Sequence, residues 1–209
     1  AYLRAVPLRT EAVQTVKLVQ QGAARHPDDP FALRATAWAE LWYGDLAEAR
    51  TRLDALLKCA PNDPDIRHMS GLCDVRMAYK SNDSQLFLRA RGEFAAAHRL
   101  DESRAVSLFR YVECDLQLEK TMTPHMVDVL VTAYRIAPQV DPIALVSAQA
   151  LIQHKRWDEA AFILRPLASA PHGGLNADRA KSFLQAAKTK EQASFAFFAA
   201  ANRLDHEYE

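Results

Sequence analysis

Apolar residues recur along most of this chain at the spacing of three to four residues that gives a helix one buried face. The pattern is helical over residues 31–43 and again over residues 46–58, and the dipeptide Gly44-Asp45 interrupts it. Glycine and aspartate favour turns, so the interruption marks a tight connection and not a longer loop. The sequence therefore predicts two helices joined as a hairpin.

Proline clusters flank this hairpin. Pro27-Asp28-Asp29-Pro30 recurs after the hairpin as Pro61-Asn62-Asp63-Pro64, and a third version follows at Pro138 and Asp141-Pro142. Proline cannot continue a helix, whereas Asp and Asn cap the next helix and proline fits its first turn. Each cluster is thus expected to end one helix and start another.

The hairpin pattern has a second copy further downstream, in which every matching position is displaced by the same interval. Its members are Ala37, Leu41, Glu48, Ala49, Leu53 and Leu56, which correspond to Ala148, Ile152, Glu159, Ala160, Leu164 and Leu167. The small residues Ala37 and Ala49 stand where the two helix backbones must approach closely, and Gly71 follows Ala37 at the interval that separates Pro27 from Pro61. The chain therefore contains a structural repeat.

These segments resemble the tetratricopeptide repeat (TPR) family. The resemblance rests on Leu46-Ala47-Glu48-Ala49, Trp157-Asp158-Glu159-Ala160, the Gly44-Asp45 turn and the closing Pro61, and it covers about residues 30–172. It implies an all-α fold, a right-handed α-α superhelix of antiparallel helix pairs. The chain departs from the family's usual large first-helix residues at Thr36, Glu40, Ser70 and Asp74.

We expect a single TPR-like domain over residues 1–209. Its parts are N-terminal helices over 1–29, repeats over 30–63, 64–104, 105–140 and 141–172, and capping helices over 173–209, namely 175–188 and 192–203. The second repeat is stretched, because Cys73-Asp74-Val75 aligns with Cys114-Asp115-Leu116 at a longer interval than the one that separates Pro27 from Pro61. Its extra length is expected to form two longer helices with a polar loop over residues 80–85.

Composition narrows the class of function. Lys plus Arg and Asp plus Glu number 26 each, so there is no excess field to attract nucleic acid or an anionic membrane. No apolar run approaches the roughly 20 residues that span a bilayer. Cys59, Cys73 and Cys114 fit neither a disulfide framework nor a metal knuckle, so they are expected to be buried thiols.

Motifs of catalysis and cofactor binding are absent from the sequence. It contains no GxSxG, HExxH, Walker or GxGxxG pattern, and its seven histidines form no pair at metal-ligand spacing. We therefore expect no catalytic residue, cofactor or metal, and the chain is not expected to be an enzyme.

The resemblance implies that the first helix of each repeat lines a concave groove. The groove residues would be Arg34, Trp38, Leu41 and Trp42, then His68, Leu72, Val75 and Arg76, then Phe109, Glu113 and Gln117, then Leu145, Gln149 and Gln153. Tryptophan and arginine are enriched at binding hot spots, which favours the first two helices. Trp38 and Trp42 are one helical turn apart, however, and such a stripe can instead pack against a neighbouring helix.

The leading hypothesis is a non-catalytic scaffold that binds a protein or peptide partner in this groove. The chain begins at Ala1 without Met, so a second hypothesis makes it the C-terminal accessory part of a larger, exported enzyme. A third is self-assembly into a homo-oligomer through Phe195, Phe197 and Phe198, which could equally belong to the core of a cap. Localisation stays open between the cytoplasm and, if an upstream signal was removed, the periplasm.

Overall fold

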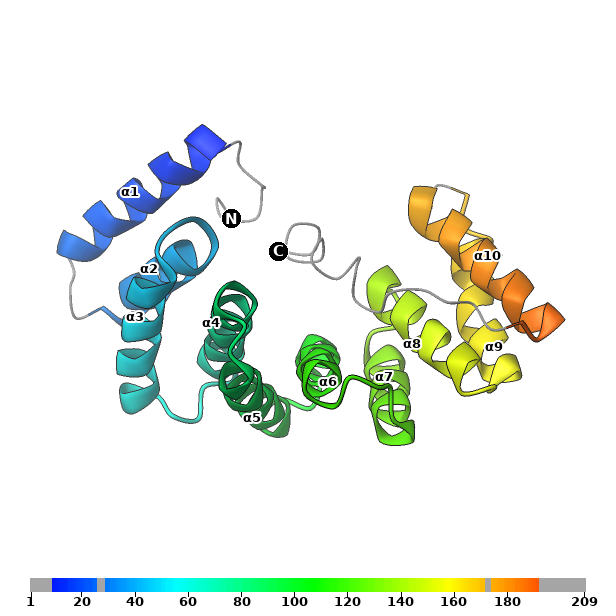
Figure 1. Cartoon of the computed structure of the whole chain (residues 1–209). Helices are drawn as coiled ribbons and strands as arrows, with labels where there is room; N and C mark the ends of the chain where they lie inside the picture. The colour runs from blue at the N-terminus through cyan, green and yellow to red at the C-terminus, as the bar shows by residue number, and fades with distance from the viewer. Residues whose placement is uncertain (1–8, 26–28, 172–173, 192–209) are drawn as a thin grey trace. The chain divides into compact units, whose positions relative to one another are not determined.

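The computed structural model describes residues 9–25, 29–171 and 174–191 (Figure 1), without the side chains of residues 9–13 and 15. All regular secondary structure in these residues is α-helical, and they form ten helices. The predicted helix at 192–203 and the three phenylalanines Phe195, Phe197 and Phe198 lie outside the described residues.

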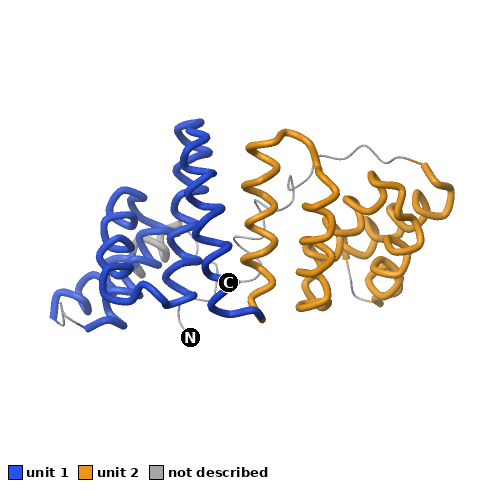
Figure 2. The backbone as a smooth tube through the Cα atoms, turned by 90° about the horizontal axis from the view of Figure 1, so that it is seen from below, with its two compact units in different colours: residues 1–102, 209 blue, residues 103–208 orange. Residues whose placement is uncertain are grey.

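The helices belong to two compact units (Figure 2). Unit 1 contains α1 (Arg9–Arg25), α2 (Pro30–Tyr43), α3 (Leu46–Cys59), α4 (Pro64–Ser81) and α5 (Ser84–Leu100). Unit 2 contains α6 (Ala105–Glu119), α7 (Pro124–Ile136), α8 (Asp141–Gln153), α9 (Trp157–Ala168) and α10 (Gly174–Thr189). Within each unit every helix packs against the next one along the chain, which is the serial packing expected of a helical solenoid. The expected extents of the repeats and their grouping as one domain stay predictions.

Two of the three proline clusters start helices in the expected way. The Asp29 carboxylate accepts a hydrogen bond from the Phe31 N–H at 3.2 Å, at the start of α2. Asp63 accepts from the Asp65 and Ile66 N–H groups at 2.9 and 3.1 Å, at the start of α4. These bonds satisfy donors that the first helical turn leaves unpaired.

The third cluster works differently. Helix α8 begins at Asp141 itself, after Val140, and no side chain caps it. Asp141 instead adds a negative charge to the first turn, which the helix dipole favours, and it accepts a hydrogen bond from Asn176 of α10 at 3.2 Å. The third cluster therefore starts a helix as expected, but without a side-chain cap.

Small residues permit the close helix contacts that the sequence predicts. Ala37, Ala49, Ala148 and Ala160 are completely buried. A Cβ atom on Gly71 of α4 would lie 2.7 Å from the Phe94 ring of α5, well inside contact distance. The absence of a side chain at Gly71 is therefore what lets Phe94 pack against the α4 backbone.

The stretched repeat consists of longer helices and a shorter loop than expected. Helices α4 and α5 have 18 and 17 residues, whereas α2 and α3 have 14 each. Only Asn82 and Asp83 separate α4 from α5, so the predicted polar loop over residues 80–85 was wrong in extent. Asn82 adopts a left-handed φ of 55°, which asparagine tolerates, and Asp83 caps α5 by accepting from the Gln85 N–H.

The described cysteines are all free thiols, but they differ in burial. Cys73 and Cys114 are buried as expected, whereas Cys59 is exposed. Cys59 is the last residue of α3 and its neighbour Lys58 is exposed too, so the end of this helix faces solvent. The expectation of a buried thiol at Cys59 was wrong.

Candidate partner-binding face

Three aromatic side chains of α2 lie against one another near its C-terminal end. The ring centroids of Trp38 and Trp42 are 6.0 Å apart, and those of Trp38 and Tyr43 are 6.1 Å apart in an edge-on arrangement. Tilted and edge-on contacts at this separation are the favourable ones for aromatic rings. We call Trp38, Trp42 and Tyr43 the aromatic cluster; Trp38 is its centre and is half-buried.

Arg76 of α4 holds this cluster against the next hairpin. Its guanidinium carbon lies 5.0 Å from the centroid of the Trp42 ring, and its Nη1 donates a hydrogen bond to the Leu41 carbonyl. A guanidinium over an indole contributes about 0.5 to 2 kcal/mol, depending on desolvation. Arg76 therefore fixes the ring of Trp42 from outside α2, and Trp42 is only 9% exposed.

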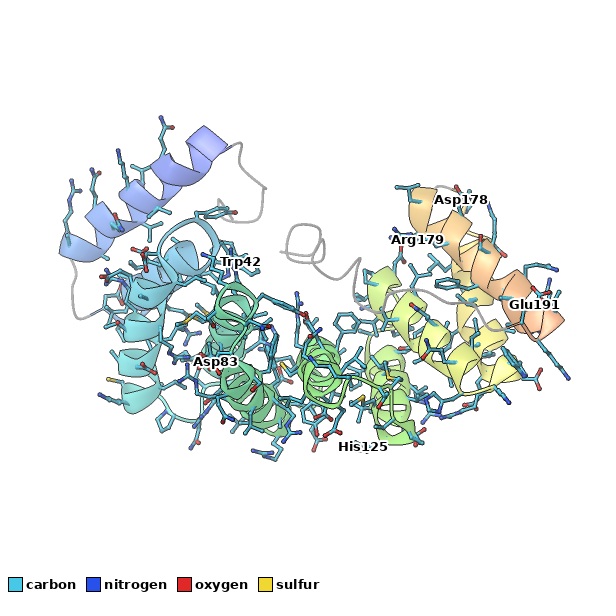
Figure 3. All side chains as sticks on the ribbon, in the orientation of Figure 1. Trp42, Asp83, His125, Asp178, Arg179 and Glu191 are labelled. Atoms are coloured by element: carbon cyan, nitrogen blue, oxygen red, sulfur yellow. The ribbon has the colours of Figure 1, made fainter. Side chains whose placement is uncertain are left out.

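The indole N–H of Trp42 is a buried hydrogen-bond donor without an acceptor in the described part of the chain. Its Nε1 atom is closed to solvent, and no acceptor in the described part of the chain lies within hydrogen-bond distance of it. A buried donor without a partner costs about 1 to 3 kcal/mol, so such groups are rare and call for an explanation. Figure 3 shows Trp42 beside α4, within the α2–α4 region of unit 1.

Arg34 stands at the other end of the same helix face. It forms ion pairs with two carboxylates at the start of α4, Asp63 and, at 3.4 Å, Asp65. The Arg34 side chain is 36% exposed, so these pairs are partly screened by water. Their effect is to tie α2 to α4 and to neutralise most of the charge that Arg34 would offer a partner.

His68 turns toward the interior of its own hairpin. Its ring centroid lies 5.2 Å from that of Phe94 on α5. The structure therefore brings Arg34, Trp38, Trp42 and Arg76 to one α2–α4 face, and it places His68 in a contact between α4 and α5.

The candidate residues of unit 2 are mostly buried. Phe109 and Glu113 have no exposed surface, and Gln149 is 5% exposed. Phe109 belongs to the hydrophobic core of unit 2, and Glu113 accepts a hydrogen bond from Arg110 at 2.7 Å. Gln153, like Gln117, is half-buried. In this conformation Phe109, Glu113 and Gln149 offer no surface to a partner.

Four aliphatic residues expected to face the groove are also buried. Leu41, Leu72, Val75 and Leu145 are between 1% and 6% exposed. They pack as core, so the exposed part of the predicted groove is smaller than the register suggested. A shift of one position along a helix rotates a side chain by about 100°, which is enough to exchange a groove position for a core position.

Two of the positions at which the sequence departs from the TPR pattern carry carboxylates whose burial the sequence analysis did not predict. The residue three positions after the small residue of the first helix is Glu40 in α2 and Asp74 in α4, and it is Leu151 in α8. Glu40 is 4% exposed, while Asp74 and Leu151 are fully buried. Their shared register position beside a buried small residue is the signal that could have predicted this burial.

Asp74 joins three helices of unit 1. It accepts hydrogen bonds from Arg50 of α3 at 3.2 Å and from the Nε of Arg89 of α5 at 2.6 Å. The hydrogen bond to Asp74 raises the pKa of Arg89, against the opposing effect of desolvation. Arg50 also donates to the Ser70 hydroxyl at 2.8 Å. This is a buried, charge-assisted network that fixes the register of α3, α4 and α5.

Nucleophile and metal chemistry find little support in the described residues. Burial raises the pKa of the Cys73 thiol to about 11, so the thiol stays protonated near neutral pH and is a poor nucleophile. Among the side chains that the structure describes, no group of three or more His, Cys, Asp and Glu is arranged to hold a metal ion. In the same residues, no helix has the length and apolar character needed to cross a membrane.

The sequence predicts Arg34, Trp38, Trp42 and Arg76 as binding residues, but it does not predict which side chains surround them. Tyr43 completes the aromatic cluster. Asp63 was identified only as part of a proline cluster, yet it is the ion-pair partner of Arg34. The pairing joins residues 29 positions apart, so no local pattern announces it.

Comparisons with known proteins bear on the fold. No family model matches the sequence, and no curated protein matches it. The structure is similar to the crystal structure of a thermophilic TPR protein of Thermus thermophilus, with a TM-score of 0.63. The similarity covers 81% of this chain and 89% of that chain, at 19% sequence identity.

A structural match of this extent at low identity establishes fold and not activity. It agrees with the serial packing of ten described helices and with the repeat that the sequence contains. The predicted all-α solenoid is therefore confirmed, and the chain has a TPR-like helical-repeat fold.

Proposed function

We propose that this scaffold is a non-catalytic interaction module that binds a protein or peptide partner on the α2–α4 face of unit 1. Trp38 provides the accessible aromatic surface, the buried Trp42 and the half-buried Arg76 hold it in place, and Arg34 lies at the edge of the face. The single observation that carries the proposal is the aromatic cluster, in which a half-buried Trp38 lies between Trp42 and Tyr43.

The cluster has the properties of a binding hot spot. Large aromatic side chains provide much contact area and lose little conformational entropy when they are already held in place. Trp38 is held by two ring contacts, and Trp42 is held by Arg76 from the neighbouring hairpin. A partner that covers Trp38 would therefore find a preformed surface.

The proposed binding face contains fewer residues than the groove predicted from the sequence. It leaves out Phe109, Glu113 and Gln149 because they are buried, and His68 because it packs on Phe94. Arg34 is kept at the edge because its side chain is partly exposed, although Asp63 and Asp65 already bind it.

Site-specific photo-cross-linking tests the proposal. Benzoylphenylalanine at position 38 of the full chain should capture a discrete partner from an extract of the source cells. The matched control carries the same group at Thr51, an exposed position on α3. Partners captured through position 38 should be absent at position 51.

The captured partner is then purified and its binding measured. Trp38→Ala, Trp42→Ala and Arg34→Ala are compared with the unmodified chain, each checked for helicity by circular dichroism. Weaker binding by folded Trp38→Ala supports the proposed face. Equal capture at positions 38 and 51, or unchanged binding by all three folded variants, would refute it.

A further inference from the structure

The side of α2 that faces α1 contains a buried carboxylate without a cationic partner. Glu40 is 4% exposed, and it accepts hydrogen bonds from the Gln20 side chain of α1 at 2.6 Å and from the Asp45 N–H at 3.2 Å. Within the described residues it forms no ion pair with Lys, Arg or His. Buried carboxylates are normally paired with a cation, because burial removes the water that stabilises their charge. Glu40 therefore lacks the partner that such a carboxylate favours.

Helices α3 and α4 show how the same register position is satisfied elsewhere in unit 1. Asp74 occupies in α4 the position of Glu40 in α2, and it accepts a hydrogen bond from Arg50 of α3 at 3.2 Å. Helix α1 packs on α2 (Figure 1), and α3 packs on α4. The register that aligns Glu40 with Asp74 also aligns Val16 of α1 with Arg50. Helix α1 thus lacks the arginine with which α3 binds the carboxylate of the next helix.

Helix α1 also carries smaller side chains than α3 at the packing positions. In the same register, the buried Leu53 and Leu56 of α3 correspond to the half-buried Val19 and to Gly22. Gly22 is exposed, and a Cβ atom there would meet nothing within 4 Å. Glycine inside a helix is destabilising relative to alanine, and no close contact requires it here. Among the described side chains of α1, only Val16 is buried.

We propose that α1 is a displaceable helix, and that an amphipathic helix of a partner protein with an arginine at the position of Val16 takes its place on α2. The arginine of the partner helix binds Glu40 as Arg50 binds Asp74, and a larger apolar residue fills the open space beside Gly22. The aromatic cluster takes no part in this exchange, so the inference does not rest on the proposed function.

The exchange depends on the difference between the two helices. The incoming helix covers the same surface of α2, so its apolar area stays buried and only the differences in contact decide the outcome. Helix α1 has the advantage of being tethered to the chain. The partner helix adds an ion pair to Glu40, which is buried and therefore screened less by salt than a surface charge. It also replaces the exposed Gly22 with a residue that favours the helix.

Two blocked, fluorescently labelled peptides of residues 9–25 test the inference by fluorescence anisotropy on the full chain. One has the natural sequence of α1, and the other carries Val16→Arg. The arginine peptide is expected to bind about tenfold tighter than the natural peptide, the effect of one hydrogen bond between charged groups. Glu40→Gln in the full chain should remove this difference, because it removes the charge and keeps a polar side chain of the same size.

Gly22→Ala in the full chain provides a second, independent test. It strengthens α1 without a steric conflict, so α1 should compete better and the arginine peptide should bind about fivefold more weakly. Gly92→Ala is the matched control, because Gly92 is an exposed glycine of α5 at which a Cβ atom would also meet nothing within 4 Å. It should leave peptide binding unchanged. Circular dichroism checks that each variant is folded.

Three results would overturn the inference. They are no binding of either peptide to the full chain, equal affinities of the two peptides, and equal effects of Gly22→Ala and Gly92→Ala. A tenfold difference that persists in folded Glu40→Gln would also refute the assigned role of this carboxylate. The proposed function is tested separately by cross-linking through position 38, so the failure of one proposal is distinguishable from the failure of the other.

Discussion

The matching hairpins α2–α3 and α8–α9, one in each unit, are stabilised by different means. In unit 1, the register position three residues after the small residue carries buried carboxylates, Glu40 and Asp74, which bind side chains of other helices. In unit 2, the position of α6 that aligns with Asp74 carries another buried carboxylate, Asp115, whereas the matching position of α8 carries Leu151, which lies in a continuous hydrophobic core. The side chain at this position is buried in each of these helices. It can be a carboxylate that accepts hydrogen bonds from other helices or an apolar residue that packs in the core.

The turns of the two matching hairpins differ as well. Between α2 and α3, Gly44 makes room for the Glu40 carboxylate, and Asp45 caps α3. Between α8 and α9, Lys155 takes a left-handed φ of 60° and the side chain of Arg156 makes no capping hydrogen bond. Arg156 instead binds Glu159 and Asp128, and its hydrogen bond lowers the pKa of Glu159. The hairpin is thus specified by its buried small residues and not by one turn sequence.

The largest loss of stability is expected when a carboxylate, as found in α2 and α4, is placed at the matching position of α8. Leu151→Asp places a carboxylate in the apolar core of that unit, and we expect a loss of more than about 4 kcal/mol in the free energy of unfolding. Urea denaturation followed by circular dichroism measures it. Phe162→Asp on α9 is the control, because Phe162 is 67% exposed and its loss should stay within about 0.5 kcal/mol. Similar losses in both variants would contradict the account.

The converse change removes the carboxylate of unit 1. Asp74→Ala leaves Arg50 and Arg89 without their shared acceptor, and we expect a loss of about 3 kcal/mol. This is the low end for a buried pair, because the Arg89 side chain is 52% exposed and water can reach it.

Two comparisons sharpen this second prediction. Asp54→Ala also removes a partner of Arg50, but this carboxylate is 56% exposed, so the change should cost less than about 1 kcal/mol. Replacing Arg50 and Arg89 by Met together with Asp74→Leu should recover stability to within about 1 kcal/mol of the original chain, because apolar packing can substitute for a buried ion pair. A triple variant as unstable as Asp74→Ala would show that the charges themselves are required.

A smaller effect is expected at the turn of the first hairpin. Asp45→Ala removes the acceptor of the Ala47 and Glu48 N–H groups, at 2.6 and 3.3 Å, and should cost about 1 kcal/mol. Asp45→Asn keeps a capping oxygen and should lower the free energy of unfolding by only about 0.3 kcal/mol. Thermal denaturation of both variants provides the measurement, and equal melting temperatures for the two would argue against the cap.

The smallest effect should be stabilising. Lys155 is in the left-handed region, where a side chain costs about 1 kcal/mol and glycine costs nothing sterically. Lys155→Gly is therefore expected to raise the free energy of unfolding by roughly 0.5 to 1 kcal/mol. Lys58→Gly, within the last turn of α3, should instead lower it by a similar amount. A decrease in both variants would mean that the backbone at Lys155 is not strained.

The sequence predicts the fold well because its strongest signals are local. Helix starts at Asp29 and Asp63 follow from capping chemistry, and the close contact at Gly71 follows from the repeat of small residues. The loop over residues 80–85 was overestimated because polar side chains on exposed helix ends look like loop residues. Only tertiary packing decides how far such helices continue.

The candidate face is less predictable from the sequence. Trp38 and Trp42 were found by residue type, but their different burial depends on where Arg76 lies, and Arg76 comes from another helix. The ion pair between Arg34 and Asp63 likewise joins two helices. Ion pairs between residues far apart in the sequence produce no local spacing pattern. The charge that the face presents to a partner therefore cannot be predicted from the sequence of one helix.

The central claim is that a partner binds the aromatic cluster of unit 1. Calorimetric titration of Trp38→Ala and Phe162→Ala with the purified partner, once cross-linking has identified it, tests this claim most directly. Each variant removes an aromatic ring that has accessible surface. The account predicts at least about tenfold weaker binding for Trp38→Ala and an unchanged affinity for Phe162→Ala. Equal affinities for the two folded variants, or a loss only for Phe162→Ala, would contradict it.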